Sequence, residues 1–196
     1  MTDINQPLND ITEIRAMMER SSKVLSLSGL SGVSAGINAL AGTLYVPWIL
    51  DRLPPEDAVP YLAADALAVL LLSIGLAVMF SRRMARRKGL PVWTATSRLL
   101  IIDLAFPLGA GGLLCLSLVF HQVFDLIPGT MLVFYGLALI SSSKYALREI
   151  RYLGVTDLAL GCAAIFFPRL GLALWGTGFG IMHIAYGLLM YYRYER

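Results

Sequence analysis

Long apolar stretches alternate with short charged links along most of this chain. About 20 apolar residues are needed for a helix to cross a hydrocarbon core of about 30 Å. Six stretches come near this length, and most charged residues fall in the links between them. The predicted transmembrane helices are Leu25–Trp48, Tyr61–Phe80, Thr96–Phe120, Ile127–Ser143, Tyr152–Phe167 and Leu170–Tyr191. The pattern therefore predicts an all-α polytopic membrane bundle of six transmembrane helices, arranged as three helical hairpins.

The same pattern divides the chain into three parts. Residues 1–24 predict a short amphipathic cytoplasmic helix that begins near Asp10, a possible helix cap. This helix either lies at the interface or under the bundle, or serves as a docking or dimerisation element. Residues 25–192 form the transmembrane domain, and residues 193–196 form a cytoplasmic tail.

Composition supports a membrane protein over a soluble one. Hydrophobic residues make up 57% of the 196 residues, charged residues only 15%, and the mean hydropathy is +0.69. The net charge of +3 comes without a nucleic-acid-binding motif or a basic stripe interleaved with aromatics. No nucleic-acid partner is expected, and the lipid bilayer is the predicted surrounding.

Lysine and arginine set the expected orientation, because they resist translocation across the membrane. The link between the second and third spans forms a basic cluster of Arg82, Arg83, Arg86, Arg87 and Lys88. The link between the fourth and fifth spans carries Lys144, Arg148 and Arg151. Both links are therefore predicted to be cytoplasmic, and so are both termini.

Small residues predict a close helix-packing face in the first and last spans. The glycines concerned are Gly29, Gly32, Gly36, Gly176, Gly180 and Gly187. Their spacing resembles small-xxx-small patterns, in which helix backbones approach closely. The expected contact lies within one chain or between two copies in a homo-oligomer.

Ionisable residues inside the spans predict a polar pocket that opens to the cytoplasm. Asp103, Asp157 and His183 fall within the third, fifth and sixth spans, with Arg98 and Lys144 nearby in the pattern. Such a pocket suits a small solute, an ion or a proton step. The structural alternative is that Arg98 or Arg151 neutralises an aspartate and holds the helices in register.

A proline and a run of small residues predict a bend or an interruption in the third span. Pro107 is followed by Gly109-Ala110-Gly111-Gly112. A proline removes one helical hydrogen bond, and glycines stabilise a helix poorly. Broken helices line transport sites in some membrane proteins, although a packed kink is the commoner outcome.

Catalytic and metal motifs are weak in this chain. Gly29-Leu30-Ser31-Gly32 resembles the GxSG motif of rhomboid proteases, which also have six core spans and a histidine in the last one, here His183. The rhomboid serine lies on the fourth span, however, whereas Ser31 lies on the first, and Gly32-Val33-Ser34-Ala35-Gly36 matches a hydrolase elbow inside a predicted helix. No catalytic residue, metal or other cofactor is therefore predicted.

Two segments resemble known bacterial membrane proteins. Ile14-Arg15-Ala16-Met17-Met18-Glu19-Arg20-Ser21-Ser22 and the following Leu25 to Gly32 resemble the start of an uncharacterised family of small bacterial six-span inner-membrane proteins. Phe167-Pro168 and Tyr186-Gly187 are similar to hairpins of proteins related to the acid-resistance membrane protein. The resemblance implies a bacterial inner-membrane location and no particular reaction.

Three hypotheses for function follow from these patterns. The first is a non-enzymatic structural, sensory or regulatory interaction protein, which self-associates or binds a cytoplasmic protein partner. The second is a transporter or channel for a small solute, an ion or a proton, which uses the polar pocket. The third is an intramembrane hydrolase that uses Ser31 or Ser34.

Overall fold

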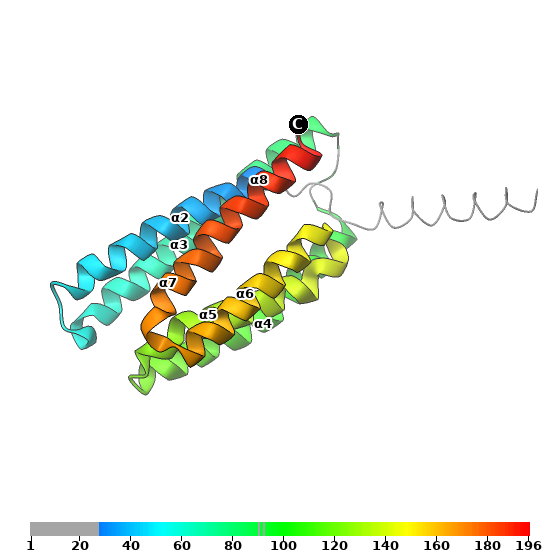
Figure 1. Cartoon of the computed structure of the whole chain (residues 1–196). Helices are drawn as coiled ribbons and strands as arrows, with labels where there is room; N and C mark the ends of the chain where they lie inside the picture. The colour runs from blue at the N-terminus through cyan, green and yellow to red at the C-terminus, as the bar shows by residue number, and fades with distance from the viewer. Residues whose placement is uncertain (1–27, 90, 92) are drawn as a thin grey trace, which may run out of the picture.

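The described part of the molecule is a bundle of long helices that run alongside one another. The computed structural model describes residues 28–89, 91 and 93–196, and no strand occurs among them. Figure 1 shows two layers: α2, α3 and α8 form one, and α4, α5 and α6 form the other. The amphipathic helix predicted within residues 1–24 lies outside the described residues.

The first three helices follow the predicted spans but differ at their ends. Helix α2 covers Gly29–Leu50, α3 covers Pro55–Arg87 and α4 covers Ala95–Phe120. Helix α3 begins with a proline, which suits the first helical turn. At 33 residues, α3 is about 50 Å long and extends past the predicted span on both sides.

The next two helices form the other layer. Helix α5, Ile127–Ser142, continues from the 3₁₀ turn Phe124–Leu126 and into the 3₁₀ turn Ser143–Tyr145. Helix α6, Arg148–Phe166, begins one turn earlier than predicted. Because the N-terminal end of α6 is rich in charge, its apolar part is shorter than in the other long helices.

The last span is built from three joined pieces. The 3₁₀ turn Pro168–Leu170 leads into α7, Gly171–Trp175, then into the π-helix η4, Gly176–Met182, and finally into α8, His183–Tyr194. Helix α7 packs against α5 and α6, whereas α8 packs mainly against α2. The last span therefore crosses between the two layers (Figure 1).

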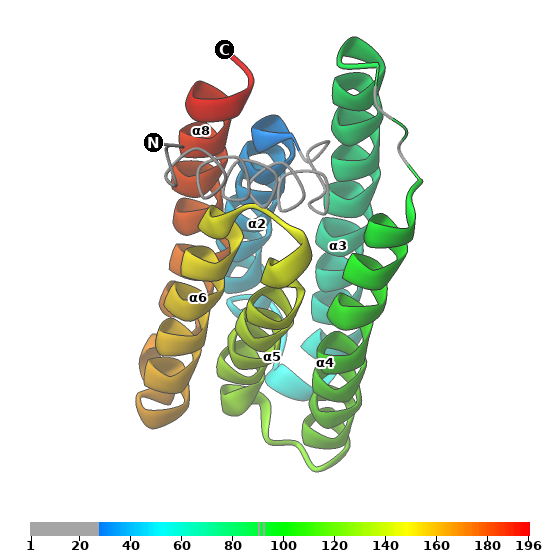
Figure 2. The same ribbon diagram turned by 90° about the vertical axis from the view of Figure 1, so that its right-hand side faces the viewer.

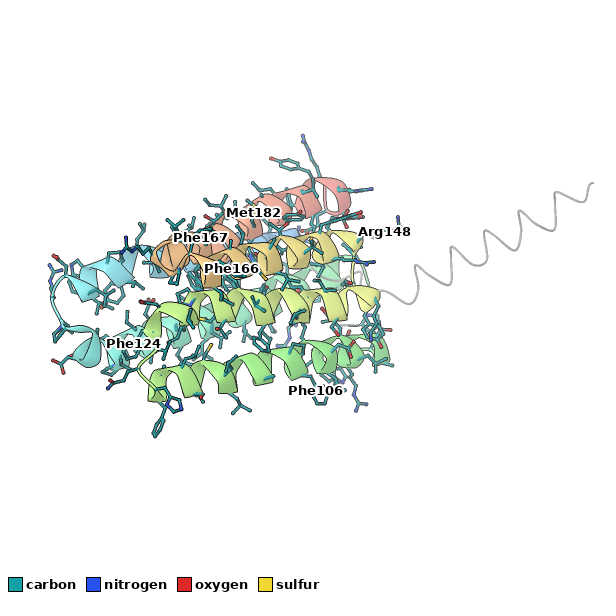
Figure 3. All side chains as sticks on the ribbon, turned by 60° about the horizontal axis from the view of Figure 1, so that its bottom comes forward. Phe106, Phe124, Arg148, Phe166, Phe167 and Met182 are labelled. Atoms are coloured by element: carbon teal, nitrogen blue, oxygen red, sulfur yellow. The ribbon has the colours of Figure 1, made fainter. Side chains whose placement is uncertain are left out.

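Five helical segments of the described chain are long and apolar enough to cross a membrane. They are Gly29–Leu50, Asp57–Arg87, Ala95–Phe120, Phe124–Tyr145 and Pro168–Tyr194. Helix α6 is not among them, since its 19 residues include Arg148, Glu149, Arg151 and Asp157. Arg148 lies at the end of the bundle in Figure 3, where it can reach a headgroup layer.

The interruption predicted in the third span is wrong. Helix α4 continues through Pro107 to Phe120 without a break. Side chains such as Phe106 point away from the bundle here (Figure 3), and Gly109 and Gly112 have open space beside them. The irregular segment lies instead in the last span, where the seven-residue η4 replaces α-helical geometry.

Helices α3 and α4 are the outer members of the two layers. Each packs chiefly against one neighbour, α3 against α2 and α4 against α5 (Figure 2). Both leave large apolar side chains exposed, including Leu71 on α3 and Leu113 on α4. An aqueous protein would bury such surfaces, whereas lipid tails solvate them.

Glycines bring the backbones of α2 and the last span into direct contact. A Cβ added at Gly36 would lie 2.6 Å from the carbonyl oxygen of Gly180, and one added at Gly187 would lie 2.6 Å from the amide nitrogen of Val33. Gly29 also meets the backbone of Gly187. The predicted glycine faces of the two spans thus oppose each other within one chain. Gly32 contacts the backbone of Gly187, and Gly176 contacts the side chain of Thr43.

A second contact of this kind joins α5 to α6. A Cβ at Gly136 would lie 2.6 Å from the carbonyl oxygen of Gly154, and one at Gly161 would lie 2.6 Å from the amide nitrogen of Val133. The two glycines of α6 are seven residues apart, which keeps them on one helix face. The predicted helix-packing face did not include these glycines, although their seven-residue spacing is visible in the sequence.

Candidate functional site

Asp157 is the most deeply enclosed ionisable residue of the described chain. It is the central residue of α6, about 14 Å from either helix end, and its exposed fraction is 0%. Neither carboxylate oxygen has a hydrogen-bond partner among the described residues. Buried carboxylates are normally paired or hydrogen-bonded, so this arrangement marks a candidate site.

The π-helix η4 packs directly against this carboxyl group. A Cβ added at Gly178 would lie 2.8 Å from Asp157 Oδ1 and 2.5 Å from Leu132 Cδ2. Only glycine leaves room for the aspartate at this position. A π-helical turn is rare and is found frequently at functional sites.

His183 begins α8 immediately after the π-helix and is buried. Its Nδ1 lies 2.9 Å from the carbonyl oxygen of Gly178, and its Nε2 lies 2.8 Å from the hydroxyl of Tyr135 on α5. A carbonyl oxygen only accepts, so Nδ1 carries a hydrogen. The hydroxyl of Tyr135 can then donate to Nε2, and both bonds are satisfied by a neutral imidazole.

An aromatic cluster closes the site on one side. The ring of Phe179 lies 4.8 Å from that of Tyr135 and 5.0 Å from that of Trp175, and it stacks on His183 at 5.9 Å. Gly178 connects this cluster to the carboxyl group, because its carbonyl bonds to His183 and its α-carbon faces Asp157 Oδ1. The carboxyl group therefore lies among apolar and aromatic side chains with one imidazole and one phenol nearby.

The other predicted aspartate belongs to a different place. Asp103 Oδ2 lies 2.6 Å from Lys144 Nζ, and the hydroxyl of Ser141 lies 3.5 Å from the same oxygen. Ser141 and Tyr135 are six residues apart on α5, about 9 Å along its axis. The five residues of the predicted pocket therefore do not form one site: Asp157 and His183 lie together, and Asp103 and Lys144 lie together elsewhere.

Neither of the arginine pairs expected to hold the helices in register is present. Arg98 and Arg151 are exposed, and neither forms an ion pair among the described residues. Lys144 takes the place expected for Arg98, because the turn after α5 brings it over Asp103. Among the described residues, no lysine, arginine or histidine forms an ion pair with Asp157.

The serines singled out for hydrolysis bond within their own helix. The hydroxyl of Ser31 donates to the carbonyl of Ser28, and that of Ser34 donates to the carbonyl of Ser31. Both nitrogens of His183 already bond to Tyr135 and Gly178. The structure does not bring a serine and His183 together as a nucleophile and base.

A second buried acid, which sequence reasoning missed, ties α6 to the end of α8. Glu149 accepts hydrogen bonds from Arg193 and from the hydroxyl of Tyr194, both at 2.9 Å. Glu195 likewise accepts from the hydroxyl of Ser28 and the amide of Gly29. These contacts join the predicted cytoplasmic ends of three helices, and nothing in their sequence spacing indicates the pairs.

The basic cluster lies at the end of α3. All five of its side chains are exposed, and none forms an ion pair among the described residues. Four of its arginines border an open hollow on the face of α3, above apolar residues. The hollow is lined by Gly75, Val78, Met79, Arg82, Arg83, Arg86 and Arg87.

Comparison with known proteins supplies no relative from which a role can be inferred. No family model, no curated protein and no solved structure matches this chain. In the described part of the chain, no group of three or more histidine, cysteine, aspartate or glutamate residues gathers in a way that could hold a metal ion. The case for function therefore depends on the geometry around Asp157 and on the charged end of the bundle.

Proposed function

We propose that this protein is a non-enzymatic component of a bacterial inner membrane, with six spans and a sensory or regulatory role exerted through interaction. The observation that carries the proposal is the sealed state of Asp157 and His183. Close helix packing surrounds both residues, and the other predicted polar pair lies elsewhere on the bundle. A solute path would instead place such groups along one water-filled cavity.

The six-span arrangement adds α6 to the five apolar segments. Helix α6 lies between α5 and the last span, so its central aspartate is shielded from lipid. Both termini then face the side that carries the basic cluster, Lys144 and Arg148, as the positive-inside rule requires. The contacts of Glu149 with Arg193 and of Glu195 with Ser28 gather at this same end.

Interaction in this proposal takes place at the cytoplasmic end. Helix α3 is longer than the membrane core, so its arginines extend to the headgroup layer or beyond it. Exposed arginines above an apolar hollow suit anionic lipid headgroups or an acidic protein segment. Two copies of the chain would associate through the outer faces of α3 and α4, because the glycine faces are already occupied within the chain.

Proton or cation transport is the second candidate, and one observation favours it. A buried carboxylate without a described partner is typical of proton pathways in membrane proteins. Transport requires that Asp157 meets water from each side in turn. The two candidates therefore differ in the accessibility of this one residue.

Thiol accessibility distinguishes the candidates. Cys115 and Cys162 are first replaced by alanine, and single cysteines are then placed at 51, 86, 157 and 183. A membrane-impermeant thiol reagent is applied to each face of sealed vesicles, with and without detergent. We expect position 86 to react only from the cytoplasmic face and position 51 only from the opposite face, because Asp51 follows α2 at the other end.

Positions 157 and 183 decide the functional class. No reaction at either position, in variants that elute as folded protein, supports the interaction protein. Reaction at 157 or 183 from a vesicle face overturns it in favour of transport. Reaction of 51 and 86 from the same face would instead overturn the six-span topology.

A further inference from the structure

The unpartnered carboxyl group of Asp157, at the centre of α6, must either bind a cation or be protonated. An isolated ionised carboxylate is strongly disfavoured in an apolar interior, and it becomes neutral unless a cation balances it. We propose that Asp157 is a proton-binding site, and that uptake or release of its proton changes the packing of α6 against the π-helix η4. The inference rests on the sensory role proposed above and names the proton as the signal.

A proton fits this site better than a metal ion does. Hard cations need six or more oxygen ligands, whereas this site offers the two carboxylate oxygens. Besides Asp157 itself, the nearest neighbours of the Cβ position at Gly178 are the apolar side chains of Leu132 and Leu160. A proton needs only one carboxylate oxygen and brings no hydration shell into the packed interior.

The surroundings of His183 and Asp157 favour the neutral form of both groups. A neutral imidazole with its hydrogen on Nδ1 satisfies the carbonyl of Gly178 and the hydroxyl of Tyr135 together. The phenol oxygen of Tyr135 can also accept a bond from a charged ring, but His183 is buried, and burial disfavours the charged form. Among the described residues, no cationic nitrogen forms an ion pair with Asp157.

Other ionisable groups lie too far away along the helices to neutralise Asp157. From the elements packed on α6, only Tyr135 and His183 lie at its level; η4 and α7 have no ionisable side chain. At one end of α6, Glu149 is bonded to Arg193, and Lys144 is bonded to Asp103. The other ionisable side chains of α6 and of the elements packed on it are Tyr145, Arg148, Arg151, Tyr152, Cys162, Arg169, Tyr186, Tyr191, Tyr192 and Tyr194. The nearest cation on α6, Arg151, is about 9 Å away along the axis.

Loss of the proton would act directly on the π-helix. An ionised carboxylate requires donors or water, yet neither oxygen of Asp157 has a donor among the described residues, and the α-carbon of Gly178 faces Oδ1. Ionisation therefore favours a rearrangement of η4 that brings a donor or water to the carboxylate. Because η4 is already a non-standard turn at the crossing between the two layers, a small shift there moves α8 relative to α6.

Infrared spectroscopy of the full chain in lipid nanodiscs tests the first part. Protein labelled with ¹³C at the aspartate side-chain carbonyl is prepared with Asp65 replaced by asparagine, because Asp65 is a further aspartate within a span. We expect a protonated-carboxyl band at neutral pH that disappears at alkaline pH. Asp157→Asn should abolish the band, whereas Asp103→Asn should leave it unchanged, since Asp103 is paired with Lys144.

Tryptophan fluorescence tests the second part. Trp48→Phe and Trp93→Phe leave Trp175, which contacts Phe179 beside the site, as the single reporter. We expect the emission of Trp175 to change over the same pH range as the infrared band. In Asp157→Asn, a neutral mimic of the protonated acid, the emission should stay constant over that range.

The outcomes separate this inference from the proposed function. Absence of a protonated aspartate band at neutral pH, which needs no variant at residue 157, overturns the proton site. A titrating band with unchanged Trp175 emission overturns the packing change. Neither result alters the accessibility test, which alone decides between the interaction protein and the transporter.

Discussion

Asp103 and Asp157 both lie within long helices of the bundle, yet their surroundings differ completely. The side chain of Asp103 is 20% exposed and forms an ion pair with Lys144, whereas that of Asp157 is fully enclosed and unpartnered among the described residues. Asp103 lies about 12 Å from the start of α4, beside the end of α5, whereas Asp157 lies at the centre of α6. The comparison shows that helix packing, rather than residue type or position along the helix, decides whether an acid meets a counter-charge.

A permanent charge at each position gives the largest expected difference. Asp157→Lys places a cation that cannot reach a headgroup at the bilayer centre, which costs about 3 kcal/mol, or roughly a hundredfold in the folded population. Asp103→Lys should be tolerated far better, because position 103 is partly exposed and lies beside the end of α5, from which a lysine can extend toward water. The yield of monodisperse protein after membrane extraction measures both, and equal losses would break the comparison.

Helix packing around Asp157 gives the next largest effect. Gly136→Leu forces a side chain against the backbone of α6 and should destabilise the bundle by about 1–3 kcal/mol. Gly109→Leu on α4 is the matched control, because a side chain there enters open space. The thermal unfolding midpoint of each purified variant is the measurement, and equal midpoints would contradict the close α5–α6 contact.

Removal of one hydroxyl group tests the bond to His183. Tyr135→Phe deprives Nε2 of its partner and should lower the stability by about 0.6 kcal/mol, the average for hydrogen bonds between membrane helices. In a double-mutant cycle with His183→Leu, the second substitution should add less than its effect alone. Strict additivity would show that the two side chains do not interact.

The Asp103–Lys144 pair should give the smallest effect. Lys144→Met removes a cation that is itself largely exposed, so the Tm should fall only slightly and the difference should shrink at high salt. Asp103→Asn in the Lys144→Met background should recover part of the loss. A fall in Tm larger than that of Tyr135→Phe would contradict the assignment of this pair to the membrane surface.

The sequence by itself determined the all-helical character of the chain and the position of most links, and five of the six predicted spans have helices long and apolar enough to cross a membrane. These features depend on the length of apolar runs and on the placement of charges, which are local properties. The helix boundaries of α4 and α5 differ from the predicted ones by one residue at most. The interruption predicted at Pro107 is wrong because a membrane helix tolerates a single proline when local adjustment satisfies the freed backbone group.

The grouping of the polar residues was decided only by the tertiary structure. Sequence placed Asp103, Asp157, His183, Arg98 and Lys144 in one pocket, because all five lie toward one end of their spans. The structure divides them, since α5 separates the α4 side from the α6 side. Tyr135 and Gly178 joined the site through helix contacts that no local spacing encodes.

The close approach of η4 to α6 shows why the sequence alone could not predict which polar residues lie together. Whether a glycine meets a carboxylate depends on which helices are neighbours and on their rotation about their axes, and both are set by packing over the whole bundle. The glycines of Gly176–Met182 permit a tight contact, but they do not indicate which helix makes it. Only the assembled bundle places Asp157 beside Gly178 and leaves its carboxyl group without a counter-charge.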